Sequence, residues 1–163
     1  LYLAVLIAVN TGMRKSEVLS LRVPVNGENR DKINWVDLKN GCFHLNITKT
    51  CRYRQVFISE TLMPYIIKAV EESESGNLFQ VKDIRASYSS AMKKAGIEDG
   101  NFHDLRRTFI SHLMMAGVSQ AVIQRVVGQE DPSVFKRYAH LSNNANINVM
   151  NTMGNILSGE KLM

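Results

Sequence analysis

Residues 101–119 read "NFHDLRRTFISHLMMAGVS", the pattern of an amphipathic helix with a charged first turn. The dipole of a helix favours anions over cations at its N-terminus, so a histidine and two arginines in that turn need a counterion. We therefore expect a strongly anionic ligand at this place. The predicted apolar stripe is Leu105, Phe109, Leu113 and Ala116, and the charged turn holds His103, Asp104, Arg106 and Arg107.

The composition is that of a compact protein with a basic surplus. The chain has 163 residues, of which 45% are hydrophobic and 21% charged, and this suits one domain with a proper core. Lysine and arginine exceed aspartate and glutamate by 20 to 15, which gives a net charge of +5. The surplus agrees with a polyanionic partner but does not establish one, because many basic proteins bind no nucleic acid.

Cysteine usage and the apolar runs indicate a protein of the cytoplasm. Cys42 and Cys51 are too few for a disulfide framework and too far apart for a CxxC pair, which favours a reducing compartment. The run "LYLAVLIAV" (1–9) stops at Asn10 before it reaches membrane-spanning length, and it lacks the basic leader of a signal peptide. Because the sequence starts inside this predicted helix, we expect it to be part of a longer protein.

The remaining patterns predict a mainly helical chain with one small sheet. Gly12 is the expected end of the first helix. Apolar and polar residues alternate over 42–48, which predicts a strand, and 53–59 returns as its partner. Asp131 is the expected cap of a late helix, with Pro132 in its first turn. Further helices are predicted at 13–22, 60–72, 83–95 and 120–128, and a polar loop at 23–34.

Several side chains could take part in chemistry, but each taken alone has a structural explanation. Tyr138 lies at helical spacing among apolar residues, as a core tyrosine does. Arg14 and Glu17 are spaced as a surface ion pair that contributes little. Basic residues in a turn are usually exposed, as are those in the first turn of a helix. Exposure in a turn would explain Lys49, Arg52 and Arg54, and exposure in the first turn of a helix would explain His103 and Arg106.

Four motifs taken together change this interpretation. They occur in the order "TGMRKSEVLSLR" (11–22), "TKT" (48–50), "HDLRRTF" (103–109) and "YAHLS" (138–142). In this order and at these spacings they resemble the catalytic domain of the tyrosine recombinases, the phage integrase family. The resemblance runs from the first residues to about Ser142. It implies an α+β, mainly helical fold with a small antiparallel β-sheet.

The resemblance also implies a role for each matching residue. Arg14 and Arg106 match the two arginines of the family, His103 its histidine, Lys49 the lysine on its hairpin, and Tyr138 its nucleophile. Glu17 matches the acidic residue that supports the site. The implied reaction is attack of the Tyr138 hydroxyl on a DNA phosphodiester, which gives a 3′-phosphotyrosyl link and needs no metal, cofactor or ATP.

The sequence departs from the family pattern at two places. Gln129 stands where the family usually has a histidine or tryptophan; its amide can donate a hydrogen bond to a phosphate oxygen but cannot act as an acid or base. The polar loop at 23–34 is longer than usual. Arg30 or Lys32 in it could contact DNA, although a solvated loop is the simpler interpretation.

Three other functions are alternatives to the recombinase: a DNA-binding module, a metal-dependent nuclease and a type IB topoisomerase. Residues 113–128 resemble a helix-turn-helix, so the chain could be a non-catalytic DNA binder, although only Gln120, Gln124 and Arg125 would read bases. A metal-dependent nuclease would need a carboxylate cluster, and no His, Cys, Asp or Glu cluster has metal-ligand spacing. A type IB topoisomerase uses similar residues to relax supercoiled DNA.

The sequence thus predicts a site-specific recombinase of a phage or another mobile element, with double-stranded DNA as its partner and no membrane association. Residues 1–142 would form the catalytic domain and 143–163 a tail that docks onto a neighbouring subunit. By resemblance, we expect an upstream DNA-clamping domain and a homotetramer on DNA, with a monomer as the state of the isolated fragment.

Overall fold

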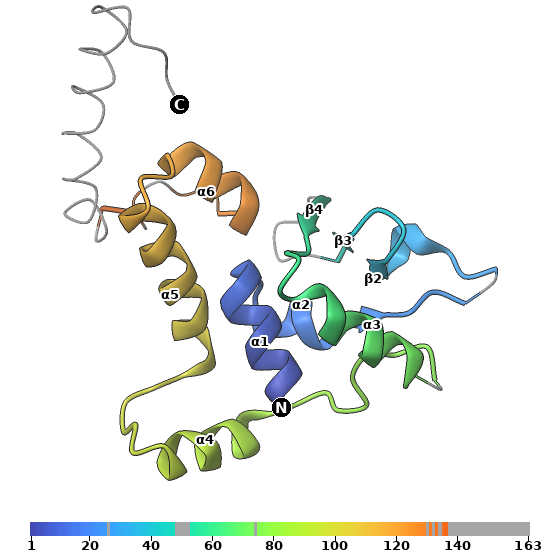
Figure 1. Ribbon diagram of the computed structural model, residues 1–163, viewed down its shortest axis with the longest axis horizontal. Helices are drawn as coiled ribbons and strands as arrows, with labels where there is room; N and C mark the ends of the chain where they lie inside the picture. Colours follow the sequence, from blue (N-terminus) through green and yellow to red (C-terminus); the bar gives the residue numbers. More distant parts are fainter. Residues whose placement is uncertain are drawn as a thin grey trace, which may run out of the picture. The chain divides into compact units, whose positions relative to one another are not determined.

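The computed structural model describes residues 1–25, 27–47, 53–73, 75–129, 131, 133, 135 and 136. It divides the chain into two compact units, the first formed by Leu1–Phe109 and the second beginning at Ile110. Figure 1 shows the elements in chain order, from α1 in blue to α6 in orange. Lys49, Tyr138 and the predicted tail at 143–163 lie outside the described residues.

The first helix, α1 (Tyr2–Thr11), ends at Gly12 as predicted. Gly12 has a φ of 65°, in the left-handed region that residues with a Cβ avoid, and its N–H donates to the carbonyl of Ala8 at 2.9 Å. Ala4, Ile7 and Ala8 are fully buried. The apolar character of this helix on most sides therefore reflects a position inside the core.

The second helix, α2 (Lys15–Leu19), is shorter than the predicted helix at 13–22. Ser20 ends it, and Leu21 then begins strand β1 (Leu21–Arg22). The carbonyl of Leu21 accepts from the N–H of Leu78, and the N–H of Val23 donates to the carbonyl of Gly76. These backbone partners draw the chain out of the helix, although an apolar residue at position 21 suits a helix equally well.

The sheet has four strands in the order β1-β2-β3-β4, with β2 at Asn34–Asp37, β3 at Cys42–Leu45 and β4 at Arg54–Phe57. The pair β3–β4 is antiparallel, as predicted, whereas β2, which was not predicted as a strand, pairs with β3 in antiparallel and with β1 in parallel. The sheet is therefore mixed. The long connection at 23–33, with a short 3-10 helix η1 (Arg30–Lys32), supplies the crossover that a parallel pair requires.

Strand β3 ends at Leu45, three residues before the end of the predicted strand. The Asn46 amide donates to the carbonyls of Arg30 and Ile33, at 2.7 and 2.9 Å. Beyond it, the Asn34 side chain accepts from the N–H of Ile47 and donates to its carbonyl. After Leu45, hydrogen bonds from the asparagine side chains thus replace the backbone hydrogen bonds of the sheet. Ile47 is exposed, although it was predicted to be buried.

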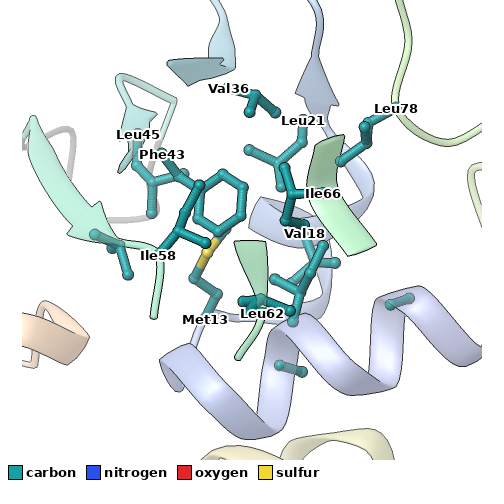
Figure 2. Close-up of a cluster of buried hydrophobic side chains, with 14 of the residues drawn as sticks. Met13, Val18, Leu21, Val36, Phe43, Leu45, Ile58, Leu62, Ile66 and Leu78 are labelled. Atoms are coloured by element: carbon teal, nitrogen blue, oxygen red, sulfur yellow. The ribbon is translucent and has the colours of Figure 1, made fainter. Parts of the chain in front are cut away.

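The core of the first unit lies on one face of the sheet. Alternation along the strands directs Val36, Phe43, Leu45 and Val56 to this face. Figure 2 shows the first three of these in one cluster with side chains from the helices and from the segments that connect them. The cluster includes Met13, Val18, Leu21, Ile58, Leu62, Ile66 and Leu78. The opposite face carries polar and aromatic side chains.

Three further helices follow as predicted, with somewhat different bounds: α3 (Met63–Glu71), α4 (Arg85–Lys94) and α5 (Phe102–Met115). The buried stripe of α5 differs from the predicted one. Its buried residues are Phe102, Arg106, Ile110 and Met114, whereas Leu105, Phe109 and Leu113 are partly exposed and Ala116 is exposed. Arg106 was predicted to belong to an exposed, charged turn. Because it is buried instead, the buried stripe lies one position away from the predicted one.

In the second unit, α6 (Gln120–Val127) ends at Gly128, close to the predicted end. Its inward residues are Ile123 and Val127. Asp131 Oδ1 accepts from the N–H of Ser133 at 2.8 Å, a contact expected of the predicted cap, whereas most of the helix that it would begin lies outside the described residues. Within the part of the chain that the structure describes, none of the helices has the length and apolarity needed to span a membrane.

Candidate active site

Four of the predicted site residues lie in the first unit. Arg14 is the residue immediately before α2, Glu17 lies in the first turn of α2, and His103 and Arg106 lie in the first turns of α5. Gln129 follows α6 in the second unit, where it is partly buried and its N–H donates to the carbonyl of Gln124 at 3.1 Å. Lys49 and Tyr138 are not among the described residues.

Glu17 holds two arginines by direct hydrogen bonds. Its Oε1 accepts from Nη1 of Arg14 at 3.1 Å and from Nη1 of Arg54 at 3.1 Å. Its Oε2 accepts from Nη2 of Arg54 at 2.7 Å and from the backbone N–H of Arg14 at 2.8 Å. The carboxylate thus caps α2 and also fixes the Arg14 side chain.

This carboxylate is ionised although it is buried. Only 2% of the Glu17 residue is exposed, and burial alone raises its pKa. The hydrogen bonds and positive charge of Arg54, and then those of Arg14, outweigh burial and hold the pKa below its ordinary value. One carboxylate therefore faces two guanidinium groups, so the cluster has a surplus of positive charge that suits an anionic ligand.

Arg106 connects α5 to the turn between α1 and α2. It is 3% exposed, and its Nη1 donates to the carbonyl of Gly12 at 2.8 Å. Gly12 lies two residues before Arg14 in the sequence. The contact therefore holds the first turns of α5 beside the start of α2, although 94 residues separate the two partners.

His103 is exposed in the first turn of α5. Partial removal of its ring from water, followed by the positive charges of Arg106, Arg107 and Arg14, lowers its pKa. A neutral imidazole at neutral pH can accept a proton. The helix end is also capped, because Asn101 Oδ1 accepts from the His103 N–H at 2.9 Å and Asp104 accepts from the Asn101 N–H at 2.8 Å.

Arg14 and His103 line the same pocket. Its volume is about 400 Å³, and its walls come from the start of α2, from α4 and from the first turn of α5. The wall is apolar at Met13, Tyr88 and Phe102 and cationic at Lys15 and Arg85. The structure thus brings together Arg14, Glu17, His103 and Arg106 as the sequence analysis predicted, next to a basic pocket in which an anion is favourable.

Arg54 is the site residue that sequence reasoning missed. It was assigned to an exposed turn, but it lies at the start of β4 with a side chain that is only 10% exposed. Its position in the strand contained a usable signal. Residues two apart on a strand point to the same face, so Arg54 points to the same side as Val56 and Ile58, both of which face the core. A charged residue on this inward side needs a buried partner of opposite charge.

The two residues of the long loop that could contact DNA are placed on its short 3-10 helix. Arg30 and Lys32 lie on η1 and are exposed, and the Arg30 guanidinium stacks over the Trp35 ring at 4.8 Å. This position belongs to the outer face of the sheet, on the strand β2.

The structure also corrects the expectation that no ligand cluster is present. Asp37, Cys42 and His44 each offer one ligand atom, and these atoms all lie within 4.8 Å of one another on β2 and β3. They are not part of the arginine cluster. The sequence has none of the short spacings of known zinc motifs at these residues, because the register of two strands brings them together.

The sequence matches a protein family and several curated proteins. Residues 1–145 match the phage integrase family. The chain is 31% identical to the integrase of Salmonella phage P22, over 84% of this chain and 38% of that protein. It is 30% identical to the shufflon-specific DNA recombinase of Escherichia coli, over 86% of this chain and 35% of that protein. The chain spans less than half the length of these curated relatives.

A solved structure agrees with the sequence matches. The catalytic domain of the bacteriophage HP1 integrase has a TM-score of 0.67 to this chain at 28% identity, covering 91% of this chain and 79% of that one. The α+β, mainly helical fold class is thereby confirmed. Because the family match extends over most of the sequence and includes all four motifs, the chain belongs to the phage integrase family.

Proposed function

We propose that the chain is the catalytic part of a site-specific DNA recombinase that cuts and rejoins DNA through a 3′-phosphotyrosyl intermediate. The observation that carries this proposal is the arrangement around Arg14. A buried Glu17 fixes Arg14, Arg106 is tied to Gly12 two residues away, and His103 shares a pocket with Arg14. Such a preorganised group of cations suits a phosphate at which negative charge builds up during reaction.

The two arginines suit the charge of a phosphodiester under attack. As phosphorus becomes five-coordinate, negative charge increases on its non-bridging oxygens. Arg14 and Arg106 would hold these oxygens, since each guanidinium is permanently charged and can bind two of them. Side chains would then supply the charge that a metal ion supplies in other phosphoryl-transfer enzymes.

The proposed reaction forms one phosphorus–oxygen bond and breaks another. The Tyr138 oxygen attacks phosphorus, and the bond to the 5′-oxygen of the next nucleotide breaks. His103 would accept the proton of the Tyr138 hydroxyl, whose ordinary pKa is about 10. Lys49 would donate a proton to the departing 5′-oxygen. The phosphotyrosyl ester retains the energy of the broken bond, so that rejoining needs no ATP.

The assembly around this chemistry is also a proposal. DNA would be the substrate, as it is for the shufflon-specific DNA recombinase to which the chain is similar. Residues 1–142 would be the catalytic domain, 143–163 a segment that docks onto a neighbour, and an upstream domain would clamp DNA. Four copies on two DNA sites would exchange strands. Gln129 would donate an amide hydrogen bond to a phosphate oxygen.

A non-catalytic DNA binder explains fewer of the observations. Such a protein needs no buried carboxylate that fixes an arginine beside a histidine of lowered pKa. On α6, the predicted reading residues are Gln120 and Gln124, which are partly buried, and Arg125, which is exposed. A type IB topoisomerase would use the same chemistry, so only the products distinguish it from a recombinase.

Covalent trapping tests the proposal. The full-length protein is incubated with supercoiled DNA that carries the ends of its element, without added divalent metal, and the reaction is stopped with denaturant. Mass spectrometry of the digested protein should find a nucleotide adduct on the peptide that contains Tyr138. The variant Tyr138→Phe should give no adduct, whereas Tyr65→Phe, which changes an exposed tyrosine of α3, should give the adduct of the unchanged protein.

Two results would contradict the proposal. DNA binding without an adduct in the unchanged protein and in Gln129→His would favour the binding module. An adduct accompanied by relaxed circles, with no exchange of strands between two sites, would favour the topoisomerase. Recombinant products that depend on Tyr138 would support the recombinase.

A further inference from the structure

The outer face of the sheet carries three potential metal ligands on neighbouring strands. Asp37 ends β2 and pairs with Cys42 at the start of β3 in the antiparallel register, and His44 follows Cys42 on the same face. Cys42 and Asp37 are buried, and the His44 side chain is 13% exposed. Carboxylate, thiolate and imidazole are the ligand types that zinc uses in proteins.

The distances from His44 to the other two ligand atoms fit tetrahedral coordination. His44 Nε2 lies 3.2 Å from Asp37 Oδ2 and 3.5 Å from Cys42 Sγ. Tetrahedral zinc with ordinary bond lengths separates a nitrogen ligand from an oxygen ligand by about 3.4 Å and from a sulfur ligand by about 3.6 Å. The two distances from His44 therefore fit one ion, while the Asp37 oxygen and Cys42 Sγ, which lie within 4.8 Å of each other, have to be about 3.5 Å apart when both bind it.

Neighbouring groups orient two of the three ligands. His44 Nδ1 lies 2.9 Å from the Tyr53 hydroxyl, which can accept the Nδ1 proton and leave Nε2 free to bind a metal. The Trp35 ring stacks on the imidazole at 4.1 Å between centroids and 5° between planes. Asp37 accepts hydrogen bonds from the backbone and side-chain amides of Asn40, at 3.0 and 2.8 Å. Such outer contacts are typical of ligands held for a metal ion.

Charge and access agree with the same interpretation. A divalent cation would be neutralised by the Asp37 carboxylate and a Cys42 thiolate, so that no uncompensated charge would be buried. Binding would release the thiol proton to solvent. A pocket of about 500 Å³, lined by Arg30, Trp35, His44 and Tyr53 among others, reaches His44 from outside.

We propose that Asp37, Cys42 and His44 bind one Zn²⁺ ion that fastens β2 to β3, with water as the fourth ligand. The ion has a structural role and takes no part in the proposed strand cleavage, which uses other residues. It closes the hairpin turn at 38–41 and thereby stabilises the sheet from which Arg54 reaches Glu17. A structural zinc contributes its binding energy to folding.

Cobalt substitution gives a direct test on the 163-residue chain. The chain is freed of metal with a chelator, dialysed and titrated with Co²⁺. We expect one Co²⁺ per chain, with the intense visible bands of tetrahedral cobalt and the near-ultraviolet charge-transfer band of a cobalt–thiolate bond. Cys42→Ser should abolish the charge-transfer band. Cys51→Ser, which removes the other of the two cysteines, should keep it.

Zinc binding measured by calorimetry tests the other ligands. His44→Gln and Asp37→Asn should each weaken Zn²⁺ binding by roughly 100-fold or more, and Tyr53→Phe by roughly 10-fold, because it removes only an outer contact. His112→Gln, which changes an exposed histidine of α5, should leave the affinity unchanged. Zinc should also raise the unfolding temperature of the unchanged chain but not that of His44→Gln.

X-ray absorption at the zinc edge reports the ligands of the ion in the unchanged chain. It therefore tests the proposal even if a variant fails to fold. It should show one sulfur at about 2.3 Å and nitrogen or oxygen ligands at about 2.0–2.2 Å. Absence of stoichiometric binding, a shell without sulfur, or a charge-transfer band lost in Cys51→Ser and kept in Cys42→Ser would each overturn the proposal. None of these results depends on DNA cleavage, so the outcome is independent of the proposed recombinase activity.

Discussion

Arg106 donates a hydrogen bond from its buried guanidinium to the carbonyl of Gly12 at 2.8 Å. This contact joins the helix that carries His103 to the turn that precedes Arg14. The second arginine of the site is therefore a structural residue as well as a candidate ligand of phosphate. Changes at this position should affect stability and activity together.

Arg106→Gln is expected to lower both properties. Loss of a hydrogen bond from a charged group should reduce the free energy of unfolding by about 1.5–3 kcal/mol. Loss of one stabilising cation should reduce the rate of DNA cleavage roughly 100-fold or more. Urea denaturation and single-turnover cleavage measure the two effects. Arg107→Gln, which changes an exposed neighbour paired with Asp104, is the control and should be close to the unchanged chain in stability.

Arg54→Met should destabilise the chain through Glu17. It removes two of the four hydrogen bonds to a buried carboxylate, and the breaking of a buried ion pair costs about 3 kcal/mol. The double variant Glu17→Gln with Arg54→Met should lose less stability than the sum of the single changes, because the charges of Glu17 and Arg54 are removed together and neither is left buried without the other. Additive losses in urea denaturation would show that the two residues do not interact. Arg85→Met, at an exposed arginine, is the matched control.

Acid should destabilise the chain through the same carboxylate. Glu17 has a folded-state pKa below its ordinary value of 4.5, so its contribution is fully present above about pH 5 and is lost as the pH falls through the lowered pKa. The free energy of unfolding should therefore decrease below pH 5, and the decrease should be smaller in Glu17→Gln. An equal decrease in both proteins would assign the acid sensitivity to other groups.

The cleavage rate should depend on the protonation of His103. Its pKa is lowered from 6.5, so the neutral ring that accepts the proton persists to a pH below 6.5. Single-turnover cleavage should be constant at neutral pH and fall only at a pH below 6.5. His103→Gln should be slower and should lose this acidic limb. A limb that persists in His103→Gln would transfer the role of base to another group.

Gln129 offers a test of the departure from the family pattern. If its amide donates to a phosphate oxygen, Gln129→Ala should slow cleavage by roughly 10–100-fold, the cost of a hydrogen bond to a charged group. Gln129→His should be at least as fast as the unchanged protein. Equal rates for the unchanged protein and Gln129→Ala would place this residue outside the reaction. Gln124→Ala, on the same unit, is the control.

The sequence predicted those features that depend on one short stretch. Gly12 ended α1 because a residue without a Cβ tolerates a positive φ, and Asp131 capped its turn because a carboxylate oxygen reaches the N–H two residues later. The motifs also selected Arg14, Glu17, His103 and Arg106, which lie in one unit of the structure, and their roles in the reaction stay predictions. Lys49 and Tyr138 stay predictions, since they lie outside the described residues.

The features that were missed depend on contacts between distant stretches. Strand β2 has four residues after a polar loop, and only its pairing with β1 and β3 makes it a strand. The burial of Arg54 depends on Glu17, which lies 37 positions away. Leu21 could continue a helix or begin a strand, and the hydrogen bond from the N–H of Leu78 to its carbonyl favours the strand. The Asp37–Cys42–His44 cluster needed the strand register, which no local spacing gives.

Gly12 has a further consequence for how this protein tolerates mutation. It has no functional group, yet its left-handed φ of 65° would cost another residue about 1–2 kcal/mol, and its carbonyl is the acceptor for Arg106. In a saturating mutagenesis screen scored by recombination, replacements at position 12 should lower the score through lost stability, and β-branched residues should lower it most. Genetic data alone would then rank it with the catalytic side chains, although its contribution comes entirely from its backbone.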